Sequence, residues 1–400
     1  MGGSKPKLLS LGRKCCGCGA CAARCPHGCI AMKGDACGFA YPDIDLEACI
    51  GCSACDAVCP ALGDSRNDDG CKVALWAKAK DRELLDASSS GGVFGLLARD
   101  ILSRGGIVVG AAWDDDCKAL RHVAIECERE LNSIMRSKYL QSAVGEMIYE
   151  QVRNALRSGR PVMFAGTACQ VAAVRAYLGR LAQSDSLLLV DVICHGVPSP
   201  ELWRRWLEYQ ERIEQAEIHS VNFRSKITGW LSFSVLYEYR TEKDSASRSS
   251  ANKFADDWYM KAFLKNASLR PSCFSCPAKR ACGSDITLGD FWGVQRRHPE
   301  VSVEGGVSAV VINTKRGMAA FDRVSGSMSY GESSFQSIVR GNPALVSSVE
   351  PASCRDEFVR AIEDGVPILD MMKKWPFDTP LLQRCVGFAK RVAKRLLGRM

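Results

Sequence analysis

Eight cysteines near the N-terminus recur in two frames of identical spacing, each closed by a proline. The first frame holds Cys15, Cys18, Cys21 and Cys25, and the second holds Cys49, Cys52, Cys55 and Cys59. Both read C-x2-C-x2-C-x3-C-P, in which one tight loop presents three thiolates to three corners of a cube. The proline then ends the local turn. The repeat predicts two [4Fe-4S] clusters.

In this run the fourth cysteine of each frame ligates the other cluster. We therefore expect Cys59 to complete the first cluster and Cys25 to complete the second. Zinc is the alternative, because paired C-x2-C units also build tetrahedral sites, but zinc does not need eight cysteines in two identical frames. Cys16, Cys29 and Cys37 lie off the register, and we interpret them as spare buried thiols.

Four more cysteines, farther along the chain, could meet as a third site. Cys169 follows a predicted buried strand and opens a helix, where the helix dipole stabilises a thiolate. Cys194 ends the next buried strand, and open α/β sheets gather ligands at such strand ends. Cys273 and Cys276 form a C-x2-C pair. A third [4Fe-4S] cluster, a structural zinc and merely buried thiols all fit these four, and the spacing alone does not prove that they converge.

Two polar stretches could bind a ligand. SSSGGVF, from Ser88 to Phe94, places small residues before a predicted helix, where backbone amides favour a phosphate. A plain N-cap is its alternative. RSKYLQS, from Arg136 to Ser142, clusters polar side chains and has an ordinary polar loop as its alternative.

The elements that must position these residues alternate between strands and helices. Strands are expected at 73–78, 106–113, 161–166 and 187–196, with helices at 91–105, 147–159 and 169–179 between them, and a late core strand at 306–317. This alternation predicts an α/β domain with a mostly parallel sheet. Residues 221–240 read as an antiparallel hairpin, so the sheet is expected to be mixed.

We therefore expect an α+β/α/β chain, with a small ferredoxin-like domain ahead of a larger mixed-sheet α/β domain. The predicted divisions are a two-cluster domain at 1–63, a linker and first strand at 64–85, the α/β domain at 86–345 and an extension at 346–400. A two-cluster domain of this size takes its stability from metal rather than from a core.

Composition and charge restrict the cellular compartment and the classes of binding partner that we expect. The chain has 400 residues and 21 cysteines, and neither a signal peptide nor an apolar run long enough to span a membrane is apparent. A reducing, cytoplasmic location is expected, with cysteines as ligands rather than bridges. The net charge of +8 is concentrated in the last thirty residues, so nucleic-acid binding over the body of the protein is not indicated.

The C-terminal stretch from Leu381 to Met400 has apolar residues at helical spacing and basic residues on the other side. A basic amphipathic helix of this kind can lie on the anionic inner face of a membrane. The alternative is a terminal helix that packs on the body and exposes its basic face. The pattern does not separate the two interpretations.

From about residue 14 to about residue 317, the chain resembles the coenzyme F420 hydrogenase/dehydrogenase beta-subunit family, in the bacterial form with a fused N-terminal two-cluster ferredoxin domain. Seven phrases carry the resemblance, in the expected order: SSSGGVF, SKYLQS, GTACQVAAVRAYL, DVICHGVPSPELW, NFRSKITGW, RPSCFSC and DITLGDFWG. The resemblance implies an oxidoreductase that contains FAD and iron-sulfur clusters.

Site residues follow from the matching phrases. The resemblance implies that FAD is lined by Ser89, Ser90, Gly91, Gly92, Lys138, Tyr139 and Gln141. It also implies roles as ligands or near the flavin for Cys169, Cys194, Cys273 and Cys276. The family commonly has proline where Ala168 stands, which loosens the turn before Cys169, and Cys282 falls where the family varies.

The expected function is a relay of single electrons from the clusters to FAD, which exchanges two electrons with an organic substrate or a deazaflavin. An external low-potential donor or acceptor such as ferredoxin is the expected partner. His195 and Asp290 are the candidate acid-base groups, although each has a structural alternative in orienting a loop or fixing a turn. An electron-transfer subunit without a substrate site, and a non-enzymatic iron-sulfur protein, are the alternative functions.

Overall fold

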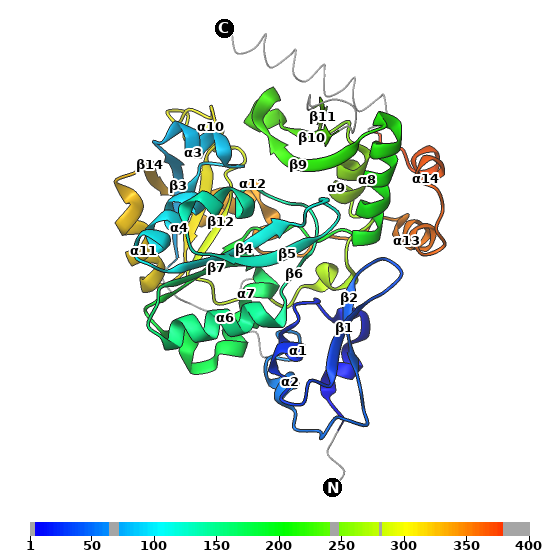
Figure 1. Cartoon of the computed structure of the whole chain (residues 1–400). Coiled ribbons are helices and arrows are strands. Elements are labelled where there is room, and N and C mark those ends of the chain that lie inside the picture. The colour runs from blue at the N-terminus through cyan, green and yellow to red at the C-terminus, as the bar shows by residue number, and fades with distance from the viewer. Residues whose placement is uncertain (1–4, 64–71, 241–247, 280–281, 379–400) are drawn as a thin grey trace.

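Three β-sheets organise the chain in the computed structural model, which describes residues 5–63, 72–240, 248–279 and 282–378 (Figure 1). A two-stranded sheet lies in the N-terminal unit, a nine-stranded sheet forms the centre of the body, and a three-stranded sheet lies beside it. The expected α/β body with a small N-terminal unit is confirmed.

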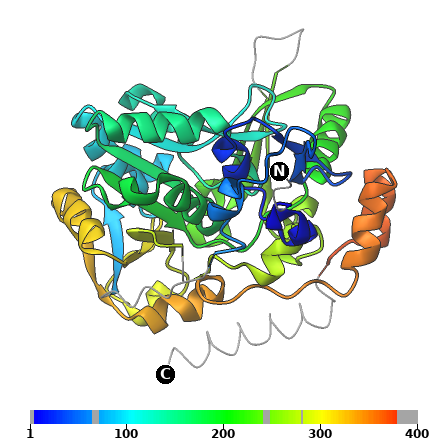
Figure 2. The same ribbon diagram turned by 90° about the horizontal axis from the view of Figure 1, so that it is seen from below.

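The N-terminal unit consists mostly of loops around short elements. These are η1 (Lys7–Lys14), α1 (Ala20–Arg24), β1 (Ile30–Gly34), β2 (Ala40–Ile44) and α2 (Ala54–Ala57). β1 and β2 are antiparallel, with Ile30 opposite Ile44. In Figure 2, which views the molecule from below, this unit is dark blue and lies against the body.

The nine-stranded sheet has the order β14-β3-β13-β12-β8-β7-β4-β5-β6. Its strands are β3 (Val73–Ala79), β4 (Ile107–Trp113), β5 (Leu120–Ile125), β6 (Ser142–Ala143), β7 (Val162–Thr167), β8 (Leu187–Val192), β12 (Ile286–Asp290), β13 (Ser308–Ile312) and β14 (Met328–Ser333). The four central strands β12, β8, β7 and β4 are parallel, whereas β13, β3, β14 and β5 pair antiparallel. β3 lies inside this sheet, so the first strand after the linker belongs to the body.

Helices cover both faces of the sheet because successive side chains of its central strands point to opposite sides. Met163 packs with α4 (Val93–Ser103) and α11 (Lys315–Ser325) on one face. Phe164 packs with α6 (Glu146–Arg157) and α7 (Ala168–Leu178) on the other. Both faces are buried, which explains the unbroken apolar runs in the sequence.

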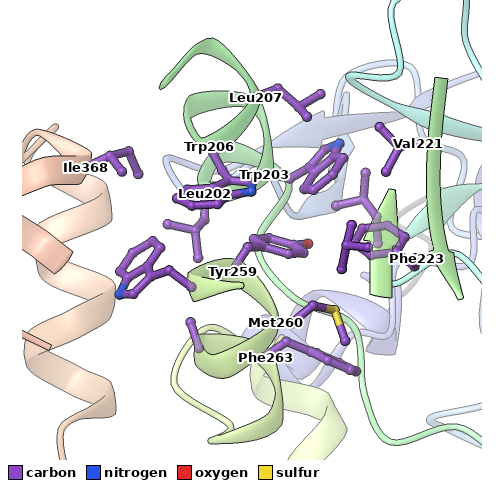
Figure 3. Close-up of a cluster of buried hydrophobic side chains, with 14 of the residues drawn as sticks. Leu202, Trp203, Trp206, Leu207, Val221, Phe223, Tyr259, Met260, Phe263 and Ile368 are labelled. Atoms are coloured by element: carbon purple, nitrogen blue, oxygen red, sulfur yellow. The ribbon is translucent and has the colours of Figure 1, made fainter. Parts of the chain in front are cut away.

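The antiparallel hairpin expected at 221–240 forms, but it does not join the large sheet. β9 (Glu217–Ser225), β10 (Ser234–Arg240) and β11 (Arg248–Lys253) make a separate sheet, and the large sheet is mixed because of its own outer strands. α8 (Pro200–Glu214) and α9 (Trp258–Leu264) cover the small sheet, with Trp203, Phe223 and Tyr259 fully buried between them (Figure 3).

Shorter elements and the C-terminal helices complete the described chain. They are α3 (Arg82–Ala87), η2 (Glu128–Glu130), α5 (Leu131–Ile134), η3 (Gly179–Gln183), η4 (Lys226–Thr228), η5 (Trp230–Ser232), η6 (Pro271–Ser275), α10 (Val294–Arg297), α12 (Phe335–Gly341), η7 (Pro343–Leu345), α13 (Arg355–Glu363) and α14 (Ile368–Lys374). Within the described ranges, no helix is long and apolar enough to cross a bilayer. The predicted basic amphipathic helix, 381–400, lies outside the described residues.

Candidate functional site

The two N-terminal cysteine frames have the same backbone shape. Gly17 and Gly19 have positive φ angles of 69° and 79°, and Gly51 and Ser53, at the matching positions, have 69° and 58°. Alternation of right- and left-handed residues turns successive N–H groups toward one concavity, a shape that suits an iron-sulfur cluster or another anion. The identical spacing in the sequence thus produces two matching loops.

Thiols of the two frames also lie near each other, which is compatible with the exchange of ligands expected from the spacing. Burial and the adjacent Cys15 thiol raise the pKa of Cys21 to about 12, and Cys59 from the second frame contributes to the same rise. Burial and then Asp56 raise the pKa of Cys55, and Cys25 from the first frame adds to it. A thiol of each frame therefore lies near thiols of the other.

The four cysteines of the predicted third site converge from distant segments. Cys169 lies in the first turn of α7, Cys194 follows β8, and Cys273 and Cys276 lie on and just after η6. Burial, and then the neighbouring Cys169 thiol, raise the pKa of Cys194 to about 12. All four line one cavity of about 100 Å³. The structure supplies the convergence that spacing could not prove.

In the described part of the chain, no three His, Cys, Asp or Glu side chains are grouped tightly enough for one metal ion. A [4Fe-4S] cluster presents a cube, and each thiolate binds a different iron. The shared cavity and mutual proximity of the four thiols therefore suit a cluster in their chemistry.

The turn before Cys169 is fixed without a proline. Thr167 caps α7 in a capping box, in which its backbone N–H donates to Gln170 Oε1 at 2.9 Å. The Thr167 hydroxyl also lies 3.2 Å from Cys169 Sγ. Ala168 is the first helical residue, a position that proline favours but does not require. The capping box offsets the loosening expected from Ala168.

The cysteines outside the two frames make specific contacts, which their interpretation as spare buried thiols did not include. The Cys16 thiol lies beside the Cys169 thiol, and Cys29 Sγ lies 3.3 Å from Cys25 Sγ. Cys37 is 2% exposed, and its carbonyl accepts a hydrogen bond from Ser199 Oγ at 2.7 Å. Cys282 lines the small cavity near the four converging thiols.

A second cavity, of about 910 Å³, lies where the parallel strands end and the three-stranded sheet begins. This volume is at the upper end of the range for small-molecule and cofactor sites. The segment Val192–Val197, which begins with the last residue of β8, lines both this cavity and the small one. Leu140, Ser142, Thr167, Gln170 and Ala344 also line both cavities, so the two cavities adjoin.

Five of the seven residues implied for the flavin line the large cavity: Ser89, Ser90, Gly92, Lys138 and Tyr139. Gly91 is instead packed into the sheet, where a Cβ would lie 2.2 Å from the Ala77 carbonyl oxygen. Gln141 lies on the wall of the small cavity and donates to the Cys16 carbonyl at 2.9 Å. For these two residues the structure indicates packing and interface roles.

The residues on this wall suit a phosphate-bearing cofactor. Gly92 begins α4 at a φ of 84° and provides no side-chain cap, so the first amides of the helix are available beside the cavity. Burial lowers the pKa of Lys138 to about 7, and its Nζ donates to the Met135 carbonyl at 2.7 Å. An adjacent anion would favour the charged form of this lysine. A flavin nucleotide fits this donor set.

Both predicted acid-base residues line the large cavity. His195 Nε2 lies 2.6 Å from Asn266 Oδ1, and Asn266 Nδ2 donates to the Glu350 carbonyl, so Nε2 is the donor and Nδ1 an acceptor. Burial lowers the pKa of His195, which favours the neutral ring. Asp290 Oδ1 accepts from Trp230 Nε1 at 2.9 Å, so this carboxylate is already engaged.

Sequence reasoning missed a cation on the cavity wall. Arg224, at the end of β9, is 3% exposed, and its Nη2 forms an ion pair at 3.0 Å with Asp290. Neither Nε nor Nη2 has a well-directed hydrogen-bond partner, and the guanidinium lies over the Phe233 ring at 3.9 Å from its centroid. The phrase NFRSKITGW contained this arginine, but nothing in its spacing marked it.

Comparison with known proteins matches both parts of the chain. Residues 14–62 match the 4Fe-4S dicluster domain, and residues 159–333 match the family described as the C terminus of the coenzyme F420 hydrogenase/dehydrogenase beta subunit. No curated protein matches the chain. A chain of the F420-reducing [NiFe] hydrogenase complex from Methanosarcina barkeri is similar at 18% identity, over 73% of this chain and 87% of that one, with a TM-score of 0.42. The resemblance seen in the sequence is confirmed for these two parts: residues 159–333 match the C terminus of the coenzyme F420 hydrogenase/dehydrogenase beta subunit, and the N-terminal unit carries a 4Fe-4S dicluster domain.

Proposed function

We propose that this protein is a flavin- and iron-sulfur-dependent oxidoreductase that exchanges two electrons with a small organic substrate. The observation that carries the proposal is the wall shared by the two cavities, which includes the whole segment Val192–Val197. Because Cys194 and His195 belong to both linings, groups bound in the two cavities would be neighbours. The matches of the two parts of the chain to these families support the same conclusion.

Bound clusters supply one-electron transfer and a bound flavin supplies two-electron exchange with organic molecules. The chain holds these groups with separate residue sets. Cys169, Cys194, Cys273 and Cys276 would hold the third cluster, and Ser89, Ser90, Gly92, Lys138 and Tyr139 would hold FAD.

Two side chains on the large cavity have chemistry suited to the substrate. His195 is positioned to accept a proton at Nδ1, because Asn266 fixes the hydrogen on Nε2. Asp290 orients Arg224 rather than acting as a free base, since it already accepts from Trp230. Arg224 lines the same cavity, and its positive charge suits a substrate that bears an acidic group.

Anaerobic reconstitution tests the proposal directly. The protein should then hold FAD and about twelve irons, as expected for three four-iron clusters. Reduced ferredoxin, NADH, NADPH and reduced F420 are offered in turn while the flavin absorbance is followed. We expect bleaching with a low-potential donor such as reduced ferredoxin, and reoxidation by the substrate.

Other results distinguish the alternative functions. Flavin that bleaches but turns over only with an added partner protein would indicate an electron-transfer subunit. Folded protein with iron and no flavin would indicate a non-enzymatic iron-sulfur protein. Folded, colourless protein without iron after oxygen-free preparation would contradict the proposal entirely.

A further inference from the structure

Arg270 is a fully buried cation at the contact between the N-terminal unit and the body. Its exposed fraction is 0%, and its Nε donates to the Cys15 carbonyl at 2.8 Å. Nη2 donates to the Ala40 carbonyl at 2.8 Å, and Nη1 to Gln141 Oε1 at 3.0 Å. The guanidinium also faces the Tyr41 ring at 4.4 Å from its centroid. The guanidinium donors therefore have hydrogen-bond acceptors, but all of these acceptors are uncharged.

The other two buried arginines of the described chain each have a carboxylate partner. Arg224 lies 3.0 Å from Asp290, and Arg355 lies 3.5 Å from Asp356. Arg270 makes no ion pair with any carboxylate among the residues that the structure describes. A buried cation without a counter-charge is costly, so an anion is expected beside it.

The groups around Arg270 identify that anion. Arg270 lines the small cavity together with Cys169 and Cys273, and its carbonyl accepts from the Cys273 N–H at 2.9 Å. On its other side it donates to Cys15, the first cysteine of the first frame. Thiolate-bound clusters are anionic, and their potentials depend on nearby charge and hydrogen bonds.

We propose that Arg270 is the shared counter-charge of two clusters, the one predicted on the first frame and the one predicted in the small cavity, and that it fixes these two sites beside each other. This inference rests on the proposed function. It assigns to Arg270 a positioning and electrostatic role, with no contact to substrate.

The first frame is held by a row of contacts from the body. Arg270, Gln141 and Tyr149 donate to the carbonyls of three of its residues, which are Cys15, Cys16 and Cys18. Gly17 leaves no room for a side chain here, because a Cβ would lie 2.8 Å from Arg270 Nη1.

The second frame has no such fixation. In the described ranges, no hydrogen bond from the body reaches Cys49, Cys52, Cys55 or Cys59, and Cys52 is exposed. The hydrogen bonds therefore distinguish the two frames, because they hold the first frame beside the small cavity and leave the second frame without such contacts.

The test compares full-length Arg270→Gln, Arg270→Lys and wild-type protein, all reconstituted anaerobically, in a redox titration followed by electron paramagnetic resonance. In Arg270→Gln we expect two cluster signals to shift to lower potential, because a positive charge that favours the reduced form is lost. The third signal, from the second frame, should not move. Reduction of the flavin by reduced ferredoxin should slow by about tenfold, the size typical of outer-shell changes.

Arg270→Lys keeps the charge but loses the planar fork, so its potentials should stay close to wild type. Arg205→Gln is the matched control, because Arg205 also donates to two carbonyls, of Ile362 and Val366, but lies outside both cavities. Unchanged potentials in Arg270→Gln, with all irons retained, would overturn the inference. An equal shift of all three signals would do the same.

If Arg270→Gln fails to fold, Gln141→Leu provides the second test. This variant leaves the charge in place and removes one clamp, so we expect unchanged potentials together with slower flavin reduction. Shifted potentials in Gln141→Leu would contradict the assignment of the charge to Arg270. Failure of the proposed function would be seen separately, as about eight irons or absent flavin in the wild-type protein.

Discussion

The N-terminal unit and the body bring thiols together by opposite means. In the unit, left-handed loop residues and two short helices arrange the cysteines, and the buried apolar residues beside the thiols are Leu8, Ala22 and Ile30. In the body, Cys169 and Cys194 extend from strands buried on both faces. We expect a site of the first kind to need metal in order to fold, whereas the second is held in place by a packed sheet.

The largest effect is expected in the N-terminal unit, when its cluster ligands are removed. Replacing Cys18 and Cys52 by serine removes one ligand from each N-terminal cluster, and we expect loss of about eight irons. Residues 5–63 should then be cut readily by protease, while the body keeps its thermal transition. Iron analysis, limited proteolysis and calorimetry measure this. Cys354→Ser is the control, and a protease-resistant unit without iron would contradict the prediction.

A substitution in the core of the body tests the stability of the packed sheet. Phe321, on α11, is 2% exposed and packs edge-on against Tyr330 at 5.2 Å between ring centroids. Phe321→Ala should destabilise the body by about 3–5 kcal/mol, because it leaves a cavity. Anaerobic denaturant unfolding measures the free energy, and iron analysis should show all irons retained. Leu369→Ala, at a side chain that is 45% exposed, should change little.

A substitution at the third cysteine site shows whether loss of a cluster ligand also affects the stability of the fold. Cys194→Ser should lose about four irons and keep both its thermal midpoint and its flavin, because the sheet positions residue 194 without metal. Cys282→Ser lies in the same cavity and should keep all irons. Equal iron loss in both variants would mean that Cys282 is a ligand, and no loss in either would remove the third cluster.

The smallest effect concerns pH. Burial lowers the pKa of Lys138 to about 7, so the ammonium is lost as pH rises through this value. Because a phosphate prefers the charged form, FAD affinity should fall above pH 7, by at most about tenfold per pH unit. Lys138→Met should bind FAD weakly at all pH values and show a flat profile in fluorescence titrations. Lys265→Met, at an exposed position, should follow wild type.

Local patterns predicted much of the fold. The cysteine frames were readable because all eight residues lie within one short segment and repeat the same spacing. The strands β4, β7 and β8 and the helices α4, α6 and α7 formed where apolar runs and helical periodicity indicated. Such patterns depend on neighbours along the chain, and a sequence displays those directly.

Contacts between residues far apart in the sequence could not be predicted from such patterns. The hairpin at β9 and β10 was predicted, but its placement in a separate sheet depends on packing against α8 and α9. Arg270 and Arg224 lay in phrases that carried the family resemblance, yet their roles follow from partners over a hundred residues away or from cavity walls. Convergence of Cys169 with Cys273 likewise required the folded sheet.

The exposure of Cys52 has a consequence for handling the protein. A solvent-facing thiolate is the first to meet dioxygen, so the cluster predicted on the second frame should decay earliest in air. Aerobic preparations would then contain fewer irons while the rest of the molecule is still intact, and their colour would underestimate what the living cell assembles.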